Sequence, residues 1–386
     1  MSVESEYVEQ NPDRLLLETL PGDFEQITCK AAPVNWTRKA GLGNLGIRAL
    51  PFLYARVVRY LKDNPVDLIF FTTTVFVSMA LGPVLKRRFG VPFVLDMQDP
   101  WRNDYYLTIP KADRPMKFWF NYRLQSFLEA RTMPYCDGLI SVSKGYIDDL
   151  QQRYPALQSK PAETIPFSVL RDDLEVASSL AYQGFSSDEV NIVYVGRGGK
   201  DLRQAFEAIF EGFASLLERT SDSSQVRKIR FHCFGTSYAA KGKGEKTIEP
   251  VAEKYGVQNY VSEQTDRLNY FDALSVLMAA DVILVPGSND LNYTASKLYP
   301  YVLTKKPLIV VAHEETPLVL TVREIGVGEI VALDDSNQAA SSFADILEQV
   351  VSRIPFEPDC NWEVFKKYEA PAMTRRVCQL FEKVLK

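Results

Sequence analysis

The sequence has few histidines, few cysteines and no excess of basic residues, and each shortage removes a class of function. Its two histidines, His232 and His313, are too few for a multi-histidine metal centre. The five cysteines are scattered and never take the C-x-x-C spacing, which argues against a zinc site and for a reducing compartment. Lys and Arg number 44 against 49 Asp and Glu, so the chain as a whole lacks the basic footprint of non-specific nucleic-acid binding.

A secretory signal and a membrane span are also missing from the pattern. The first residues, MSVESEYVEQNPDR, lack a basic segment followed by an apolar one. Residues 68–85 carry no charge and just reach the length of about 18 residues that a span requires. Three threonines, a serine, a glycine and a proline interrupt this run, which predicts a buried strand, a turn and a helix. We therefore expect a cytoplasmic protein.

The chain instead has the composition and rhythm of a two-domain α/β protein. A length of 386 residues with 46% hydrophobic and 24% charged residues suits two globular domains. Apolar runs of four to six residues alternate with helical patterns in two series, over 67–153 and 190–353. Continuous apolar strands between helices predict parallel sheets covered on both faces, and hence two doubly wound, Rossmann-like domains.

The predicted boundary between these domains lies within 163–176, where proline and charged residues break the alternation. We therefore expect a first domain over 1–168 and a second over 169–356, with a tail over 357–386 that crosses back to the first.

Ligands of open parallel sheets bind at the carboxyl ends of the strands, which directs attention to the residues after each strand. The segment GRGGKD (196–201) follows the strand VNIVYV and precedes a helix. Its glycines allow a phosphate to approach the backbone, and Arg197 and Lys200 supply cationic donors. The alternative is an ordinary turn with exposed cations.

A second polar loop, GSNDLNYTASKLYPY (287–301), follows the strand DVILVP and opens onto a helix. Lys297 in its first turn opposes the helix dipole unless an anion compensates. Thr294 and Ser296 can cap the helix and can also donate to a phosphate. The alternative is capping alone, with Lys297 in solvent.

Two carboxylates, Asp96 and Asp99, follow a third strand in LDMQDPW (95–101). Such a pair can serve as a general base and an orienting group. Alternatively, Asp99 caps a turn and Trp101 packs. The segment GLGNLG (41–46) matches G-x-G-x-x-G, but no strand precedes it, which favours a loop over a dinucleotide site.

The segment from 116 to 135 is both apolar and basic, and predicts a helix. It either packs on the sheet or contacts an anionic membrane surface.

The order of these motifs resembles the GT-B-fold glycosyltransferases of family 4, and within them a bacterial subgroup with a D-x-R-D-P-W signature. The resemblance spans about 67–330 and rests on VPFVLDMQDPW, CDGLISVSKGYIDDL, ETIPF, VNIVYVGRGGKDL, LNYFDALSVLMAADVILVPGS and SKLYPYVLTKKPLIVV.

The resemblance implies a hexosyltransferase of polysaccharide biosynthesis, with the donor in a cleft between the domains. It would move a sugar from a nucleotide-sugar to a glycan or lipid-linked acceptor, with retention of configuration and without a metal or other cofactor. A lipid-linked acceptor would bring it to the inner face of the membrane. Asp96 and Asp99 are then the expected base or acceptor-orienting groups. The implied donor-binding residues are Gly196, Arg197, Gly198, Lys200, Gly235, Asn292, Tyr293, Thr294, Ser296 and Lys297.

Three departures from the family pattern suggest alternatives. The two glutamates of the family's E-x7-E motif fall on Asn292 and Pro300, and a histidine common after the first-domain strand is Gln98. The start of the chain lacks the family's opening strand and Gly-rich loop, so the first domain is expected to be short at its N-terminus. A catalytically impaired relative that binds nucleotide or a protein is therefore the second hypothesis. A nucleotide-sugar epimerase is the third, and two histidines speak against it.

Overall fold

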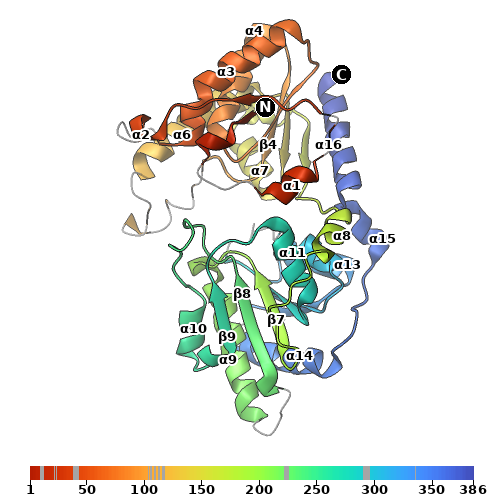
Figure 1. Cartoon of the computed structure of the whole chain (residues 1–386). Helices are drawn as coiled ribbons and strands as arrows, with labels where there is room; N and C mark the ends of the chain where they lie inside the picture. The colour runs from red at the N-terminus through yellow and green to blue at the C-terminus, as the bar shows by residue number, and fades with distance from the viewer. Residues whose placement is uncertain are drawn as a thin grey trace. The chain divides into compact units, whose positions relative to one another are not determined.

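The chain divides into two compact units, Met1–Pro166 with Met373–Lys386, and Phe167–Ala372. The computed structural model (Figure 1) describes residues 1–8, 13–20, 22, 24–37, 43–102, 104, 107, 110–111, 114, 118–220, 226–289, 296–334 and 336–386. The division at Pro166 falls close to the boundary expected from the sequence.

The returning tail is shorter than the predicted 357–386. Residues 357–372 belong to the second unit, where Asn361 N–H donates to the Ile325 carbonyl at 2.8 Å. Phe365 is fully buried there, and the Tyr368 ring stacks on Tyr299 at 4.7 Å between centroids. These apolar contacts hold the segment, so the tail begins at Met373.

The first unit is built on a parallel sheet of four strands in chain order, β3-β4-β5-β6. A separate pair, β1 and β2, is also parallel. The strands are β1 Ser2–Val3, β2 Thr28–Cys29, β3 Ile69–Thr72, β4 Phe93–Met97, β5 Gly138–Ser141 and β6 Ala162–Thr164. The helices are α1 Arg14–Glu18, α2 Val34–Thr37, α3 Leu45–Asp63, α4 Leu81–Phe89, α6 Phe118–Thr132, α7 Lys144–Arg153 and α16 Ala370–Leu385.

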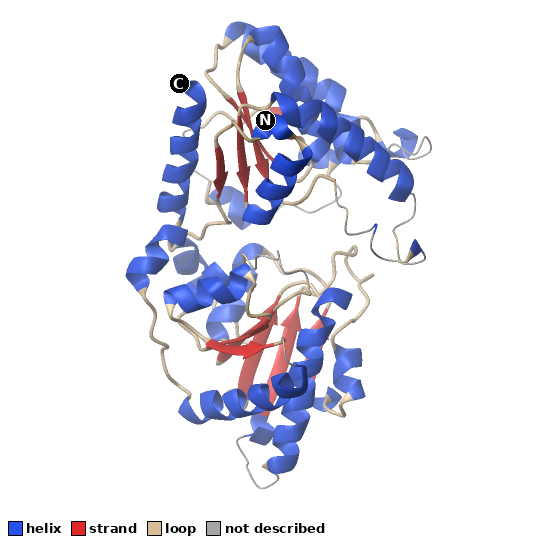
Figure 2. Cartoon of the chain, turned by 180° about the vertical axis from the view of Figure 1, so that it is seen from behind, coloured by secondary structure: helices blue, strands red, loops and turns tan. Residues whose placement is uncertain are grey.

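Helices cover both faces of this sheet (Figure 2). Alternate β4 residues Phe93, Leu95 and Met97 pack in a core on one face. On the other face lies α16, whose Phe381 ring is 5.1 Å from that of Phe70. A Cβ on Gly138 would lie 2.8 Å from Val384, so this glycine lets α16 approach the sheet.

The uncharged run 68–85 forms β3, a short 3-10 helix at Phe76–Ala80 and the start of α4, as predicted. Among the described residues, no helix is both long and apolar enough to cross a membrane. The described part of GLGNLG begins α3, where Asn44 caps the helix by accepting from Gly46 and Ile47 N–H. Residues 41 and 42 lie outside the described residues.

The second unit has a six-stranded parallel sheet in the order β12-β11-β10-β7-β8-β9. Its strands are β7 Val190–Val195, β8 Ile229–Phe234, β9 Val261–Gln264, β10 Val282–Pro286, β11 Leu308–Ala312 and β12 Glu329–Ala332. Its helices are α8 Asp172–Ser178, α9 Arg203–Arg219, α10 Glu249–Lys254, α11 Tyr270–Ala279, α12 Leu298–Leu303, α13 Pro317–Ile325, α14 Ser336–Arg353 and α15 Trp362–Phe365.

This strand order is that of a Rossmann-like domain: the chain runs outward from β7 to β9, returns to β10 and runs outward again. One core cluster joins alternate strand residues such as Ile192 and Tyr194 to α9 and α14, where Phe206, Phe210 and Phe213 are buried. The predicted fold class, an α/β chain with two parallel-sheet domains, is confirmed.

Candidate functional site

The strand order of the second unit reverses between β7 and β10, and the loops at their carboxyl ends diverge there. One backbone bond and one side-chain bond join these loops through a single residue, Asp201. Asn289 N–H donates to the Asp201 carbonyl at 3.0 Å, and the Ser288 hydroxyl donates to its carboxylate at 2.7 Å. The predicted loops are thus neighbours in space.

Arg197 is oriented by the same carboxylate. Its two terminal nitrogens donate to the two Asp201 carboxylate oxygens at 2.7 and 2.6 Å. This bidentate ion pair fixes the plane of the guanidinium group. Burial alone would raise the pKa of Asp201, but the hydrogen bonds from Arg197 and Ser288 outweigh it and hold this pKa below its usual range. Asp201 therefore stays charged and organises the loop.

Lys297, the residue directly before α12, reaches across to β7. Its Nζ donates to the Tyr194 hydroxyl at 3.1 Å and lies 4.8 Å from the centre of that ring. Burial, and the positive charges of Arg197 and Arg267, lower the pKa of Lys297 to about 7, while Asp201 opposes this. Among the described residues that act on Lys297, positive charges outnumber negative ones, which suits an anionic ligand.

The two glycines after β7 make room for neighbouring side chains. A Cβ on Gly196 would lie 1.9 Å from Lys297 Nζ, and one on Gly198 would lie 2.2 Å from Thr247 Oγ1. Their N–H groups donate to the carbonyls of Phe234 at 2.9 Å and Thr236 at 2.7 Å. The geometry therefore gives both glycines a packing reason, whereas the sequence suggested backbone approach to a phosphate.

The loop after β8 is held by a buried carboxylate that the sequence analysis missed. Glu263 accepts from the Thr236 hydroxyl at 2.7 Å and from the N–H groups of Thr247, Ile248 and Glu249 at 2.9–3.1 Å. In the sequence, the signal that could have indicated Glu263 was an acidic residue inside a strand. Gly235 beside it has a φ of +69°, a left-handed conformation that favours glycine.

A further cation was also missed. Arg267 follows β9, and its backbone lies 3.7 Å from where a Cβ of Gly235 would stand. Its guanidinium carbon lies 4.6 Å from the Tyr238 ring centre, on the exposed side of the loop. Its effect on the pKa of Lys297 places it in the same cationic cluster.

The remaining donor-side predictions fall in different places. Lys200 begins a 3-10 helix at Lys200–Leu202 and is exposed, and Ser296 is half-buried beside Lys297. Asn292, Tyr293 and Thr294 lie outside the described residues.

In the first unit, the carboxyl end of β4 carries a polar cluster around Asp96. Its Oδ2 accepts from the Thr72 hydroxyl at 2.8 Å and from Gln98 Nε2 at 3.1 Å, and Gln98 also donates to Thr72 at 3.0 Å. Asp99 lies further out, although loss of surrounding water still raises its pKa. Asp96 is thus held in a fixed orientation, and Asp99 is presented at the surface.

The segment after these carboxylates is fixed by Glu129, a buried residue of α6 that the sequence analysis also missed. It accepts from Arg102 N–H at 2.9 Å, from Arg153 at 2.7 Å and from the Tyr154 hydroxyl at 2.9 Å. Three donors satisfy the buried charge. In the sequence, the signal that could have indicated Glu129 was an acidic residue on the sheet-facing side of an aromatic helix.

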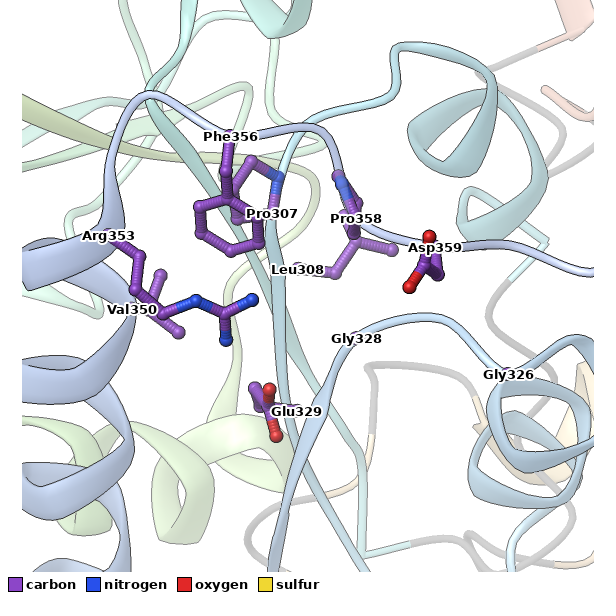
Figure 3. Close-up of a pocket in the computed structure, with 10 residues that line it drawn as sticks. All are labelled: Pro307, Leu308, Gly326, Gly328, Glu329, Val350, Arg353, Phe356, Pro358 and Asp359. Atoms are coloured by element: carbon purple, nitrogen blue, oxygen red, sulfur yellow. The ribbon is translucent and has the colours of Figure 1, made fainter.

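A small pocket lies at the opposite edge of the second sheet, where β11 and β12 begin (Figure 3). Leu308 and Glu329 line it together with Arg353 and Phe356, whose guanidinium and ring are 4.2 Å apart. Parallel sheets bind ligands at the other edge. This pocket is therefore separate from the cationic cluster.

Comparison with known proteins bears on the family and the fold of the chain. Residues 19–169 match the model of Glycosyltransferase Family 4, and no curated protein matches the sequence. The Anabaena protein HepE, solved in complex with UDP-glucose, is 14% identical over 96% of this chain and 88% of its own, with a TM-score of 0.60. Sucrose-phosphate synthase from Thermosynechococcus elongatus is 15% identical over 87% of this chain and 78% of its own, with a TM-score of 0.57.

The N-terminal domain of trehalose-6-phosphate phosphatase from Candida albicans is 15% identical over 98% of this chain and 80% of its own, with a TM-score of 0.57. Such low identities establish the fold alone. Together with the family match, they confirm the resemblance drawn from the motifs: residues 19–169 match glycosyltransferase family 4, and the chain has the two-domain α/β fold of the GT-B glycosyltransferases.

Proposed function

We propose that this chain is a retaining, metal-independent hexosyltransferase that moves a sugar from a nucleotide-sugar donor to a glycan or lipid-linked acceptor in polysaccharide biosynthesis. The observation that carries the donor side is the group of cations Arg197, Arg267 and Lys297 at the carboxyl ends of the strands of the second unit, in which Asp201 pairs with Arg197. HepE, which shares the fold, binds UDP and UDP-glucose. Retention is proposed from the family resemblance.

The cations would do the work that a metal ion does in other transferases. When the bond from sugar to diphosphate breaks, negative charge develops on the leaving phosphate. Fixed positive groups that are oriented before the reaction stabilise this charge without reorganising. The bond from Asp201 to Arg197 supplies that orientation.

On the acceptor side, Asp96 is the proposed base or orienting group. Thr72 and Gln98 both donate to one of its oxygens, Oδ2, and so hold the carboxylate in place. A carboxylate held in this way can accept a proton from a sugar hydroxyl or align it.

A nucleotide-binding screen tests the donor side. We expect one or more nucleoside diphosphates or nucleotide-sugars to raise the melting temperature of the chain. The double variant Arg197→Ala, Lys297→Met should lose this shift, whereas Lys241→Ala, an exposed lysine of the same unit, should keep it. No shift with any nucleotide, or an equal shift in the double variant, would refute the donor site.

The first unit also has a surface suited to an anionic membrane. Four residues of α6 at spacings of four, Trp119, Arg123, Phe127 and Arg131, form one face of the helix. Trp119 and Phe127 are 59% and 55% exposed, and arginine carbons lie 5.7 and 4.9 Å from their ring centres. This face, the α6 stripe, has aromatic and cationic residues without an acidic one.

Aromatic rings insert at the headgroup level of a bilayer, and arginines pair with anionic lipids. We therefore propose that the enzyme acts peripherally at the inner face of the membrane, where it would reach a lipid-linked acceptor. The opposite side of α6 packs inward through Leu128 and Glu129. One side of α6 therefore packs inward, and the exposed stripe on its other side supports the proposed membrane contact.

Vesicle sedimentation tests the stripe. The chain should sediment with vesicles that contain phosphatidylglycerol and much less with pure phosphatidylcholine. The variant Trp119→Ala, Phe127→Ala and the variant Arg123→Gln, Arg131→Gln should each weaken binding, while Phe52→Ala, an exposed residue of α3, should not. Equal binding of all variants would reject the stripe as the contact.

An alternative function is nucleotide binding without transfer. It is favoured by Pro300, which stands in α12 where the family has a carboxylate. Donor binding with no sugar released in the presence of candidate acceptors, and a stable protein partner in its place, would support this alternative.

A further inference from the structure

His313 lies at the carboxyl edge of the second sheet, directly beside the loop that enters the proposed donor site. It is the first residue after β11, and β11 pairs with β10. Gly287, the first residue after β10, packs so closely that a Cβ on it would lie 2.5 Å from the Cβ of Ala312. The next residue, Ser288, donates to the Asp201 carboxylate at 2.7 Å. The proposed donor site and His313 therefore share one stretch of packed backbone.

The ring and the backbone of His313 are both held in place. Its Nδ1 lies 3.2 Å from Asp334 Oδ1, and the other oxygen of this carboxylate accepts from the Glu314 N–H at 2.8 Å. The Thr316 hydroxyl donates to the His313 carbonyl at 2.7 Å. The imidazole side chain is 18% exposed, so it is packed as well as bonded. A ring held in this way is oriented before any ligand arrives.

The bond to Asp334 decides what the other ring nitrogen can do. The Glu314 N–H, and to a smaller extent the His313 ring, hold the pKa of Asp334 below its usual range, so its carboxylate is ionised and only accepts. Nδ1 therefore carries the hydrogen, and in a neutral imidazole Nε2 is then an acceptor. Within the part of the chain that the structure describes, Nε2 makes no hydrogen bond. The edge of the sheet thus presents an oriented acceptor for a hydroxyl group.

The position of His313 along this edge indicates which part of the donor it meets. A diphosphate bound by Arg197 and Lys297 would lie at the ends of β7 and β10, and its two substituents would leave in opposite directions. Toward β8 and β9, Tyr238 is 75% exposed and Arg267 lies 4.6 Å from its ring centre, which suits a planar base. Toward β11, His313 stands about 7 Å from the line between β7 and β10, within reach of a sugar linked to the phosphate.

We infer that His313 binds the sugar of the donor: its Nε2 accepts a hydrogen bond from a hydroxyl of the transferred sugar, and Asp334 is the positioning residue that fixes the ring. This deepens the proposed donor site and rests on it. No covalent bond changes at His313. A sugar whose hydroxyl points elsewhere leaves the acceptor without a partner, so His313 contributes to the choice of sugar.

Calorimetric titration separates the sugar from the nucleotide. The probes are UDP-glucose, UDP-galactose and UDP-N-acetylglucosamine, with UDP as the counterpart that lacks a sugar. In His313→Ala, the nucleotide-sugar that the wild type binds best should lose about five- to tenfold in affinity, and UDP less than about twofold. Asp334→Asn should show the same pattern with a smaller loss. Glu315→Ala, an exposed acid of the same turn, is the control and should change neither affinity.

Nitrogen magnetic resonance tests the ring without a variant in the site. The chain has two histidines, so the His313 signals are assigned by their loss in His313→Gln. In the donor-free wild type at pH 8, we expect the hydrogen on Nδ1 and none on Nε2. The best-bound nucleotide-sugar should shift the Nε2 signal, and UDP should leave it in place. In Asp334→Asn, part of the hydrogen should move to Nε2, which a merely structural role of Asp334 would not produce.

The outcomes distinguish this inference from the proposed function. A wild type that binds UDP and a nucleotide-sugar, with His313→Ala losing both equally or neither, would overturn the role of His313 and leave the donor site standing. A hydrogen found on Nε2 in the donor-free wild type would overturn it whatever the protein binds. A protein with the hydrogen on Nδ1 that binds none of the four probes would contradict the donor site, and with it the role of His313.

Discussion

The two units present edges of opposite charge at the carboxyl ends of their parallel strands. In the second unit, Arg197 and Lys297 lie where the strand order reverses between β7 and β10, and Arg267 follows β9. In the first, the described strands follow in chain order, and β4 ends in Asp96 and Asp99. Under the proposed function, the edge of the second unit binds the anionic donor and the edge of the first unit binds the acceptor hydroxyl.

Each edge is organised by an acid whose partners are fixed within the protein. Asp201 joins the loops after β7 and β10 and orients Arg197, and Glu129 anchors the segment after β4 through Arg102 and Arg153. The comparison teaches that these two acids position the loops. The proposed function assigns the chemistry to other residues, namely Arg197 in the second unit and Asp96 in the first. Four substitutions test this division, from the largest expected effect to the smallest.

Replacing Glu129 with alanine should cost the most stability. The change removes one of the two carboxylates that Arg153 contacts, leaving Asp104 at 3.2 Å, and takes an acceptor from both Arg102 N–H and the Tyr154 hydroxyl, which together should destabilise the chain by about 3 kcal/mol. Thermal or denaturant unfolding measures it, and Asp149→Ala, an exposed acid on α7, is the matched control. Equal stability of the two variants would show that Glu129 does not anchor this edge.

The substitution Asp96→Asn should separate the two edges functionally. It keeps the shape of the side chain and removes its basic character, so the rate of sugar transfer should fall about 100-fold. Nucleotide binding, measured by calorimetry, should be unchanged because the donor residues lie in the second unit. A matching loss of nucleotide affinity would break the proposed division of roles.

Arg197 and Lys200 test which cation of the GRGGKD loop acts on the donor. Loss of a charge-assisted bond at Arg197→Ala should weaken nucleotide binding about 10- to 100-fold. Lys200 is exposed, so Lys200→Ala should change the affinity less than about threefold. Comparable losses in both variants would restore the sequence-based expectation that the two act as a pair.

The smallest effect is expected from Gly196→Ala. The added methyl group would stand where Lys297 Nζ now lies, at 1.9 Å, and overpacking of this kind costs about 1–2 kcal/mol. Truncating the lysine in the double variant Gly196→Ala, Lys297→Ala removes the shortest contact but leaves the Tyr194 hydroxyl at 2.7 Å, so it should restore part of the stability and none of the nucleotide affinity. If the single variant is as stable as the wild type, the close packing of Gly196 against Lys297 is wrong.

Much of the fold could be predicted because its signals are local. Apolar runs such as VNIVYV and DVILVP form β7 and β10, and their carboxyl ends directed attention to Arg197 and Lys297 before any contact was known. The beginning of the returning tail, expected at 357, lies at Met373, because the burial of Phe365 and Tyr368 in the second unit depends on residues far away in the chain.

The missed site residues share that dependence on distant partners. Glu263 pairs with Thr236, 27 residues earlier, and Arg267 acts on Lys297 through space. The packing role of the glycines depends on distant partners too, because the groups that crowd Gly196 and Gly198 come from other loops.

The sequence by itself determined the class of the fold, the two-domain plan and the loops that carry the site, because apolar periodicity and strand-end positions are properties of short segments. Only the tertiary structure decided which cations meet and which carboxylates are already occupied. Charge interactions depend on distances in space and on the exclusion of water, and neither can be derived from the order of the residues.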